Sequence, residues 1–203
     1  MSSSYDNVPS DQIIDKAVQS LKENGISASV VDTAQQAKDA ALKIVPKGSR
    51  VLTPSSITVR EIGLDEVLNG PDYVSVKAEV TELYGKEDKK YEQRKLGSVP
   101  EVVVSSVHAL SQDGKILIAS ATGSQIPSEA YGADKVVLVV GAQKIVEDLQ
   151  DGLKRIEEYV VPLEDKRMMK AYGSHTSYRK LLIINKEAED RIHIIIVKEK
   201  LGF

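Results

Sequence analysis

The sequence contains no cysteine among its 203 residues. This absence excludes disulfide bonds, a thiol nucleophile, cysteine-ligated zinc and any iron–sulfur cluster held by this chain alone. No apolar run approaches the roughly 18 residues that a membrane-spanning helix needs. The first ten residues, MSSSYDNVPS, have neither a basic start nor an apolar stretch, so we expect no signal peptide and a cytoplasmic protein.

The sequence also lacks a strong excess of charge of one sign. Its 27 basic and 30 acidic residues give a net charge of −3, which argues against a dedicated nucleic-acid binder. The apolar fraction of 41% is ordinary and argues against disorder. We expect residues 1–10 to form a loose polar tail and residues 11–203 to form one domain.

The first quarter of the chain alternates helical and strand patterns. Apolar residues recur at helical spacing over residues 11–25, and a second helix is expected over 34–45. Short strand patterns follow each helix, at 27–31 and 50–52. This alternation predicts an α/β fold, a sheet flanked by helices, rather than a helical bundle or a sandwich.

The middle of the chain is less regular until about residue 101. Residues 57–68 look like one or two short helical pieces, and the highly charged stretch 84–96 is typical of a solvated surface helix or, alternatively, a lid. Two β-branched runs, EVVVSSVHAL and KILIAS, then flank the turn signature Gln112-Asp113-Gly114 and predict a hairpin.

The last third of the chain shows further strands and helices. The apolar run KVVLVV (135–140) is typical of a central strand that is covered on both faces. Helices are expected over 145–159 and 163–171, followed by the strands KLLIIN and RIHIIIVKE. The last strand is too apolar for an exposed edge, so we expect it to be buried within the domain rather than used in a contact between copies.

Candidate binding residues follow three of these strands. Ligands of α/β sheets bind beyond the carboxyl ends of the strands, and strands 50–52, 116–119 and 136–140 each run into small hydrogen-bonding residues. Each loop alone is more often a structural cap, but together on one edge of one sheet they suit a small anion. The candidate ligand-binding residues are Thr53, Ser55, Ser56, Thr58, Ser120, Thr122, Gly123, Ser124, Gln125, Gly141, Gln143 and Lys144.

Two residues have a special place in this hypothesis. We expect residues 122–125 to line the deepest pocket, with Gly123 at its centre because a backbone without Cβ allows close approach. Lys144 is expected at an exposed helix N-terminus, where its charge adds to that of the helix dipole.

The catalytic candidates are His108, Glu61 and Glu129. His108 is either a partly buried strand histidine bonded to backbone or an acid, base or ligand contact at the site edge. Each glutamate closely follows a candidate loop and is either a general base or a first-turn carboxylate. The histidines His108, His175 and His193 lack metal-ligand spacing, so no metal site is predicted.

A long stretch carries a resemblance to a known family. Residues 105–167, from SSVHALSQDGKILIASATGSQIPSEAYGADKVVLVVGAQKIV to PLEDKR, resemble the core of the lactate utilization (LUD) domain family, the lactate utilization protein C group. TPSSITVREIGL resembles the family's upstream loop, and KLLIINKEAEDRIHIIIVKEKLGF resembles its C-terminus. The resemblance covers residues 11–203 and implies a fold similar to the NagB/RpiA/CoA-transferase group.

The resemblance also implies a role in a three-protein system that oxidises L-lactate to pyruvate with iron–sulfur partner proteins. The leading hypothesis is therefore a small-anion-binding subunit that carries no cofactor of its own. The alternatives are a stand-alone transferase or cyclo-ligase, acting on a phosphorylated or CoA-linked substrate through Glu61 or Glu129, and a non-catalytic scaffold. Neither glutamate matches the glycine-rich context of the CoA-transferase nucleophile, and the oligomeric state stays open.

Overall fold

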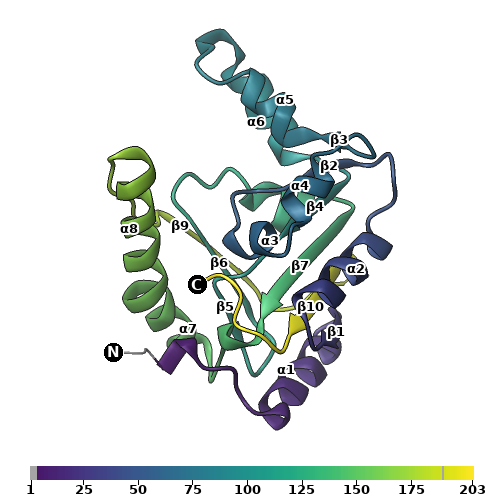
Figure 1. The fold of residues 1–203 in the computed structure, drawn as a ribbon, viewed down its shortest axis with the longest axis vertical. Coiled ribbons are helices and arrows are strands. Elements are labelled where there is room, and N and C mark those ends of the chain that lie inside the picture. The colour runs from purple at the N-terminus through teal and green to yellow at the C-terminus, as the bar shows by residue number, and fades with distance from the viewer. Residues whose placement is uncertain (1–3, 189) are drawn as a thin grey trace.

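The computed structural model describes residues 4–188 and 190–203 and contains two β-sheets with helices around them (Figure 1). All six strands of the larger sheet are parallel. Their order across the sheet is β1 (Ser27–Val31), β10 (Ile192–Val197), β7 (Lys135–Gly141), β4 (Val102–Ser105), β2 (Arg50–Leu52) and β3 (Val74–Ser75). The predicted α/β fold is confirmed.

Strand β10 lies between β1 and β7 and pairs with both along its length. Its side chains from Ile194 to Val197 are buried. The prediction that this apolar strand is covered within the domain is therefore confirmed. Strand β7 is likewise paired on both sides, with alternate side chains packing on opposite faces of the sheet, and this explains its continuous apolar run.

The smaller sheet contains four strands in the order β8 (Ile145–Val146), β5 (Ala109–Ser111), β6 (Ile116–Ser120) and β9 (Lys180–Ile184). Strands β5 and β6 form the predicted hairpin, in which Gly114 has a φ of 81°. The expectation that strand 116–119 joins the same sheet as 50–52 and 136–140 is wrong. The tight turn folds β6 back onto β5, and β9 pairs with its other edge, so the backbone groups of β6 are satisfied away from the parallel sheet.

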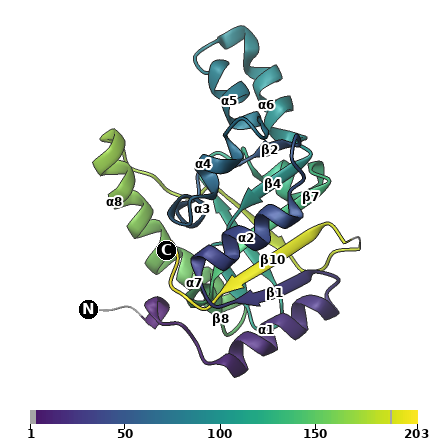
Figure 2. The same cartoon turned by 45° about the vertical axis from the view of Figure 1, so that its right-hand side comes forward.

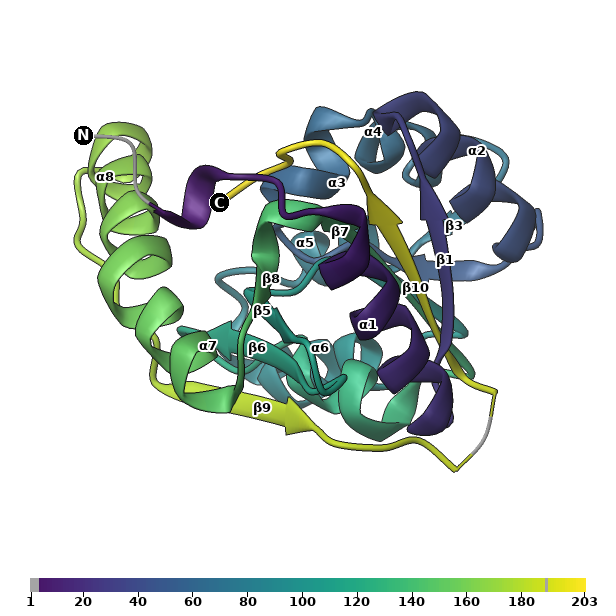
Figure 3. The same cartoon turned by 90° about the horizontal axis from the view of Figure 1, so that it is seen from below.

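Helices cover the parallel sheet on one face. Helix α2 (Ala34–Ile44), which begins with a capping box at Thr33, lies across β10 in Figure 2. The short helices α3 (Ile57–Glu61) and α4 (Leu64–Leu68) pack on the same face through Val59, Leu64 and Leu68. Figure 3 shows these helices on one side of the parallel sheet and β5, β6 and β9 on the other.

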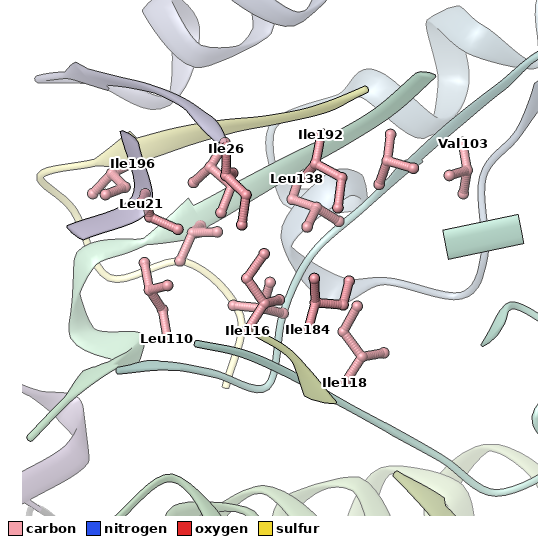
Figure 4. Packing of buried hydrophobic residues seen from close by; sticks show 14 of the residues in the cluster. Leu21, Ile26, Val103, Leu110, Ile116, Ile118, Leu138, Ile184, Ile192 and Ile196 are labelled. Carbon is pink, nitrogen blue, oxygen red and sulfur yellow. The ribbon is translucent and has the colours of Figure 1, made fainter. Parts of the chain in front are cut away.

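The main core fills the space between the two sheets and helix α1 (Asp11–Glu23). Figure 4 shows Leu21 of α1 and Leu138 of β7 facing Leu110 and Ile116 of the smaller sheet. All four side chains are fully buried, and burying a side chain of this size contributes about 1.5–3 kcal/mol. The core therefore fixes the two sheets against each other.

Helix α5 (Val76–Glu82), the short 3₁₀ turn η2 (Glu87–Lys89) and helix α6 (Lys90–Ser98) form a hairpin that projects from the edge of the molecule (Figure 1). Helix α6 buries no side chain among its residues, which confirms the prediction of a solvated helix in this region.

The predicted helix over 145–159 begins later than expected. Residues 145–146 form β8 and pair with Leu110 and Ser111. The helix begins after Asp148, whose carboxylate accepts a hydrogen bond from the Asp151 N–H at 2.9 Å and caps the first turn. It then runs without interruption as α7 (Leu149–Arg155), the π-helical turn η5 (Ile156–Val160) and α8 (Val161–Tyr172).

Part of the expected N-terminal tail is held in place. The 3₁₀ turn η1 (Ser4–Asp6) places the Tyr5 hydroxyl 2.8 Å from Asp151 Oδ1, and Tyr159 donates a hydrogen bond to Asp6. No helix in residues 4–188 or 190–203 is both long and apolar enough to cross a membrane. The same residues contain no cluster of three histidine or carboxylate side chains that could hold a metal ion.

Candidate functional site

The carboxyl ends of the parallel strands lie at one edge of the larger sheet. The loops after β2 and β7 meet there, as predicted, and the segments after β4 and β10 join them. The 3₁₀ turn η4 (Ala142–Lys144) directly follows β7 and carries Gln143 and Lys144 into this edge.

Lys144 is buried at the centre of this edge, with 3% of its surface exposed. Its Nζ donates hydrogen bonds to Thr58 Oγ1 at 2.9 Å, Ser106 Oγ at 3.0 Å and the Val107 carbonyl oxygen at 3.2 Å. The expectation of an exposed lysine at a helix N-terminus is wrong, because Lys144 leaves the strand through a tight turn that directs it inward. We name Lys144, Thr58, Ser106 and Val107 the lysine cluster.

The charge of Lys144 is poorly compensated. It forms no ion pair with any described residue, and its three partners are neutral oxygens. Burial, reinforced by the nearby charge of Arg155 and opposed by that of Glu61, lowers the pKa of Lys144 to about 7. Keeping the buried lysine in its ammonium form therefore costs free energy, and an anion placed beside it would reduce this cost.

Residues 201–202 cover the lysine cluster. The Gln143 side-chain amide donates to the Leu201 carbonyl oxygen at 2.9 Å, and Thr58 Oγ1 donates to the same oxygen at 3.2 Å. The Gly202 N–H donates to Glu61 Oε2 at 2.7 Å. Two predicted binding residues and one predicted catalytic residue therefore hold this segment over Lys144.

Arg155 is a second buried cation, and sequence reasoning missed it. It is fully buried at the end of α7, where its Nη1 donates to the carbonyl oxygen of His108. The rings of Tyr159 and Tyr5 lie against the guanidinium, with centroids 5.1 and 5.8 Å from Cζ. Burial lowers the pKa of Arg155 to about 10, so the side chain remains charged at neutral pH.

A sequence signal for Arg155 exists in the glycine three residues before it. Gly152 lies in the middle of a helix, where glycine is unfavourable. A Cβ there would lie 2.9 Å from Leu117 Cδ2, so the helix packs very closely on the smaller sheet at this point. Arg155 lies three residues after Gly152 and therefore on the same face of the helix, and both residues are buried.

His108 lies beside both cations. Its backbone N–H donates to the Leu117 carbonyl oxygen at 2.9 Å, and its Nδ1 accepts from the Ala119 N–H at 3.1 Å. Burial, with the charges of Lys144 and Arg155, lowers the pKa of His108 to about 3. A neutral histidine bonded to backbone on both sides fits the structural interpretation better than that of an acid or base.

Glu129 is fully buried in the π-helical turn η3 (Ser128–Gly132). Neither carboxyl oxygen has a hydrogen-bond partner among the residues that the structure describes, and burial raises the pKa of Glu129 to about 8, opposed by the nearby Ser105 hydroxyl. Ser105 shares a face of β4 with Val103, which packs toward the smaller sheet. Glu129 is therefore protonated at neutral pH and lies outside the lysine cluster.

The predicted loop 120–125 follows β6 and belongs to the smaller sheet. Ser120 Oγ accepts from the Gly123 N–H at 2.8 Å and donates to Gln125 Oε1 at 2.9 Å, while the Thr122 hydroxyl lies 3.1 Å from Ser124 Oγ. No hydrogen bond joins this loop to the lysine cluster in the described part of the chain. The structure thus brings together two of the three predicted loops and leaves the third with its own internal bonds.

The remaining predicted binding residues have local roles. Thr53 Oγ1 accepts from Asn69 Nδ2 at 2.9 Å, and Ser56 Oγ caps α3 by accepting from the Val59 N–H at 3.3 Å. Ser55 is exposed. A Cβ on Gly141 would lie 2.3 Å from Gln143 Oε1, so this glycine allows the Gln143 side chain to turn toward Leu201.

A surface pocket of about 330 Å³ adjoins the Arg155 side of this region. It shares Tyr159 with the surroundings of Arg155 and is lined also by Asp6 and Lys200, which form an ion pair. Residues 122–125, which were expected to line the deepest pocket, line neither this pocket nor the pocket of about 380 Å³ at the opposite end of β1 and β10.

Comparison with known proteins now identifies the family. The sequence pattern of the LUD domain matches residues 14–197. The chain belongs to the LUD domain family. The family predicted from residues 105–167 is thus confirmed, and this membership associates the chain with lactate utilization.

The LUD fold of this chain resembles a solved structure of the same group. The crystal structure of a DUF162 family protein from Deinococcus radiodurans matches 92% of this chain and 96% of that chain, with a TM-score of 0.58 and 14% sequence identity. A match to the tetrameric eIF2B-beta2-delta2 complex from C. thermophilum has a TM-score of 0.34 and 18% identity, over 60% of this chain and 47% of that chain. This TM-score is too low to indicate a shared fold. A search of the curated proteins finds no match.

Proposed function

We propose that this LUD-domain protein binds a small organic anion at the lysine cluster. The proposed role is that of a subunit or accessory of an L-lactate-oxidising system whose iron–sulfur clusters are carried by partner proteins. The observation that carries the proposal is the buried ammonium group of Lys144, which forms no ion pair with any described residue and lies beside the Ser106 hydroxyl, whose hydrogen can be donated to a ligand. A buried charge without a counter-ion is costly unless a ligand supplies one.

Two features connect this binding site with the proposed system. Membership of the LUD family supports an association with lactate utilization. The sequence contains no cysteine, so cysteine-ligated clusters would have to reside on other chains. The electron-transfer chemistry would then take place on the partners, and this chain would hold the organic acid or its product.

Calorimetric titration of the purified protein tests the binding. L-lactate, pyruvate and inorganic phosphate are the probes, and we expect at least one to bind the parent protein. Lys144→Met should weaken that binding, because it keeps the length of the side chain and removes the charge. Lys86→Met, on the exposed hairpin of α5 and α6, is the matched control and should bind as the parent does.

Growth of a deletion strain on L-lactate tests the role. The strain should grow poorly on L-lactate and normally on glucose, and the parent gene should restore growth where the Lys144→Met gene does not. Normal growth of the deletion strain on L-lactate would contradict the pathway part of the proposal and leave the binding part intact.

The alternative of a transferase acting through Glu61 or Glu129 gains little support from their positions. Glu61 Oε2 accepts a hydrogen bond from the Gly202 N–H, and burial raises the pKa of Glu129 to about 8, which disfavours its carboxylate form. Neither is placed as a free carboxylate nucleophile.

A further inference from the structure

One edge of the Arg155 guanidinium is unused. Nη1 donates to the His108 carbonyl oxygen, whereas Nε and Nη2 are buried and have no hydrogen-bond partner in residues 4–188 and 190–203. Nε–H and the adjacent Nη2–H point in the same direction and form the fork that binds the two oxygens of a carboxylate. Buried donors of a charged group are rarely left unsatisfied, so this edge calls for an acceptor.

Two other arginines of the chain show what this edge ordinarily does. Arg167 donates from Nε and Nη2 to the two carboxylate oxygens of Glu164, both at 2.7 Å. Arg191 donates from the same two nitrogens to Glu187, at 3.1 and 2.8 Å. Arg155 is the most deeply buried of the three, and it is the one whose fork has no carboxylate.

Arg155 and Lys144 also lie close to each other. They donate to the carbonyl oxygens of the consecutive residues His108 and Val107, and the charge of Arg155 acts on Lys144. Neither forms an ion pair among the described residues. Asp6 and Asp151 act on Arg155 at longer range, but they bind Tyr159 and Tyr5 instead.

We propose that the Nε–Nη2 edge of Arg155 binds the carboxylate group of the ligand, with Lys144 as the second cation of the same site. This inference rests on the proposed function and narrows its ligand to a small carboxylic acid. Two free buried N–H directions match the two oxygens of a carboxylate. A phosphate group would bring further oxygens to a buried guanidinium edge that has no more N–H groups to donate to them.

Isothermal titration with three probes tests this inference. The probes are L-lactate, its neutral amide lactamide, and inorganic phosphate. We expect L-lactate to bind the parent protein and the other two to bind it at least about tenfold more weakly, since both lack the charged planar group that the fork fits. Arg155→Lys keeps the charge and removes the fork, so it should lose about tenfold or more in affinity for L-lactate.

Two further measurements separate binding from folding. Arg167→Lys removes a fork that is occupied by Glu164 and should leave L-lactate affinity unchanged. In the parent protein, the NMR signal of the Arg155 Nε–H should shift on addition of L-lactate and stay in place with lactamide. This second readout needs no substitution at a buried position.

The outcomes distinguish this inference from the proposed function. Suppose that an anion binds the parent protein and that this binding requires Lys144. If Arg155→Lys then binds the anion as tightly as the parent does, and the Nε–H signal does not shift, the carboxylate assignment is overturned and the anion site remains. If phosphate binds more tightly than L-lactate, the ligand class is overturned. If none of the probes binds the parent protein, both proposals fail.

Discussion

Lys144 and Arg155 donate hydrogen bonds to the carbonyl oxygens of two consecutive residues, Val107 and His108. These two residues join β4 of the parallel sheet to β5 of the smaller sheet. The two cations therefore meet where the chain passes from one sheet to the other. Burial lowers the pKa of His108 and of Lys144; the charges of Lys144 and Arg155 lower that of His108 further, and the charge of Arg155 does the same to Lys144.

Ligand binding should be coupled to proton uptake. The pKa of Lys144 is lowered to about 7, so at pH 8 most of the free protein carries the neutral amine. An anion beside the amine favours the ammonium form and raises its pKa, so binding at pH 8 draws a proton from the buffer. Titration of L-lactate in triethanolamine and in Tris buffer, which differ in ionisation enthalpy, should give different observed heats. Equal heats in both buffers would show that Lys144 does not gain a proton.

Glu129 should make the free energy of unfolding depend on pH. The folded protein holds its proton up to a pKa of about 8, whereas the unfolded chain releases it near 4.5. Between these values the folded state binds more protons, so stability falls as the pH rises, by a total on the order of a few kcal/mol. Glu129→Gln has no carboxyl group to titrate, so it does not lose stability in this way. The free energy of unfolding of Glu129→Gln minus that of the parent should therefore rise from pH 4.5 to pH 8 and then level off.

Urea unfolding of both proteins across this range measures the difference, and His108 and other groups common to the two proteins cancel. Glu82→Gln, an exposed glutamate in α5, is the control and should show no such trend. A constant difference between Glu129→Gln and the parent from pH 4.5 to pH 8 would mean that Glu129 is ionised in the folded protein.

Much of the fold could be predicted because its signals are local. The spacing of apolar residues in α1, the cap at Thr33 and the turn at Gly114 each depend on a few neighbouring residues. The apolar run of β7 also identified a central strand. The strand formed by Ile145 and Val146 escaped prediction because two residues carry too little pattern to separate them from the helix that follows.

The site was only partly predictable, because its geometry depends on which sheet each strand joins. The loops of Thr58 and Lys144 were placed together correctly, since both follow strands of the parallel sheet. Gly123 was predicted to lie with them, but β6 pairs with β5 and β9 in the smaller sheet. No local sequence pattern indicates which of the two sheets β6 joins. Arg155 escaped prediction because a charged helix residue is ordinarily solvated, and its burial follows from the close packing at Gly152.

Gly123 should be required for the stability of its loop whether or not a ligand is present. Its φ is 83°, and a Cβ would lie 2.4 Å from Lys180 Cδ. Gly123→Ala should therefore lower the melting temperature through backbone strain and through displacement of Lys180, which donates to the Thr122 carbonyl oxygen at 2.9 Å. Gly85→Ala has a similar φ of 78° with no atom within 4 Å of the new Cβ, so it isolates the strain.

Differential scanning calorimetry of the two variants measures the contribution of packing. The expected result is a larger loss for Gly123→Ala than for Gly85→Ala, with L-lactate affinity unchanged in both. A different result would place loop 120–125 in the ligand site: loss of L-lactate binding in Gly123→Ala with a fall in melting temperature no larger than that of Gly85→Ala.

Gly202 should control access to Lys144. Its φ is 63°, and a Cβ would lie 2.5 Å from Thr58 Oγ1 and 3.4 Å from Lys144 Nζ. Gly202→Ala should therefore push residues 201–202 away from Thr58 and break the bond from the Gly202 N–H to Glu61. An amine-directed acetylating reagent, followed by mass spectrometry, reports how accessible Lys144 is. In the parent protein the residue should be protected, because 3% of its surface is exposed.

In Gly202→Ala the labelling rate of Lys144 should rise by about tenfold, as expected when a local opening becomes easier by about 1.4 kcal/mol. Gly173→Ala is the matched control, since Gly173 has a φ of 66° and no atom within 4 Å of a new Cβ. Its labelling should equal that of the parent. Lys144 that stays as protected in Gly202→Ala as in Gly173→Ala would show that another part of the chain shields the lysine. In that case the route to Lys144 would have to be sought beside Tyr5, on the Arg155 side of the site.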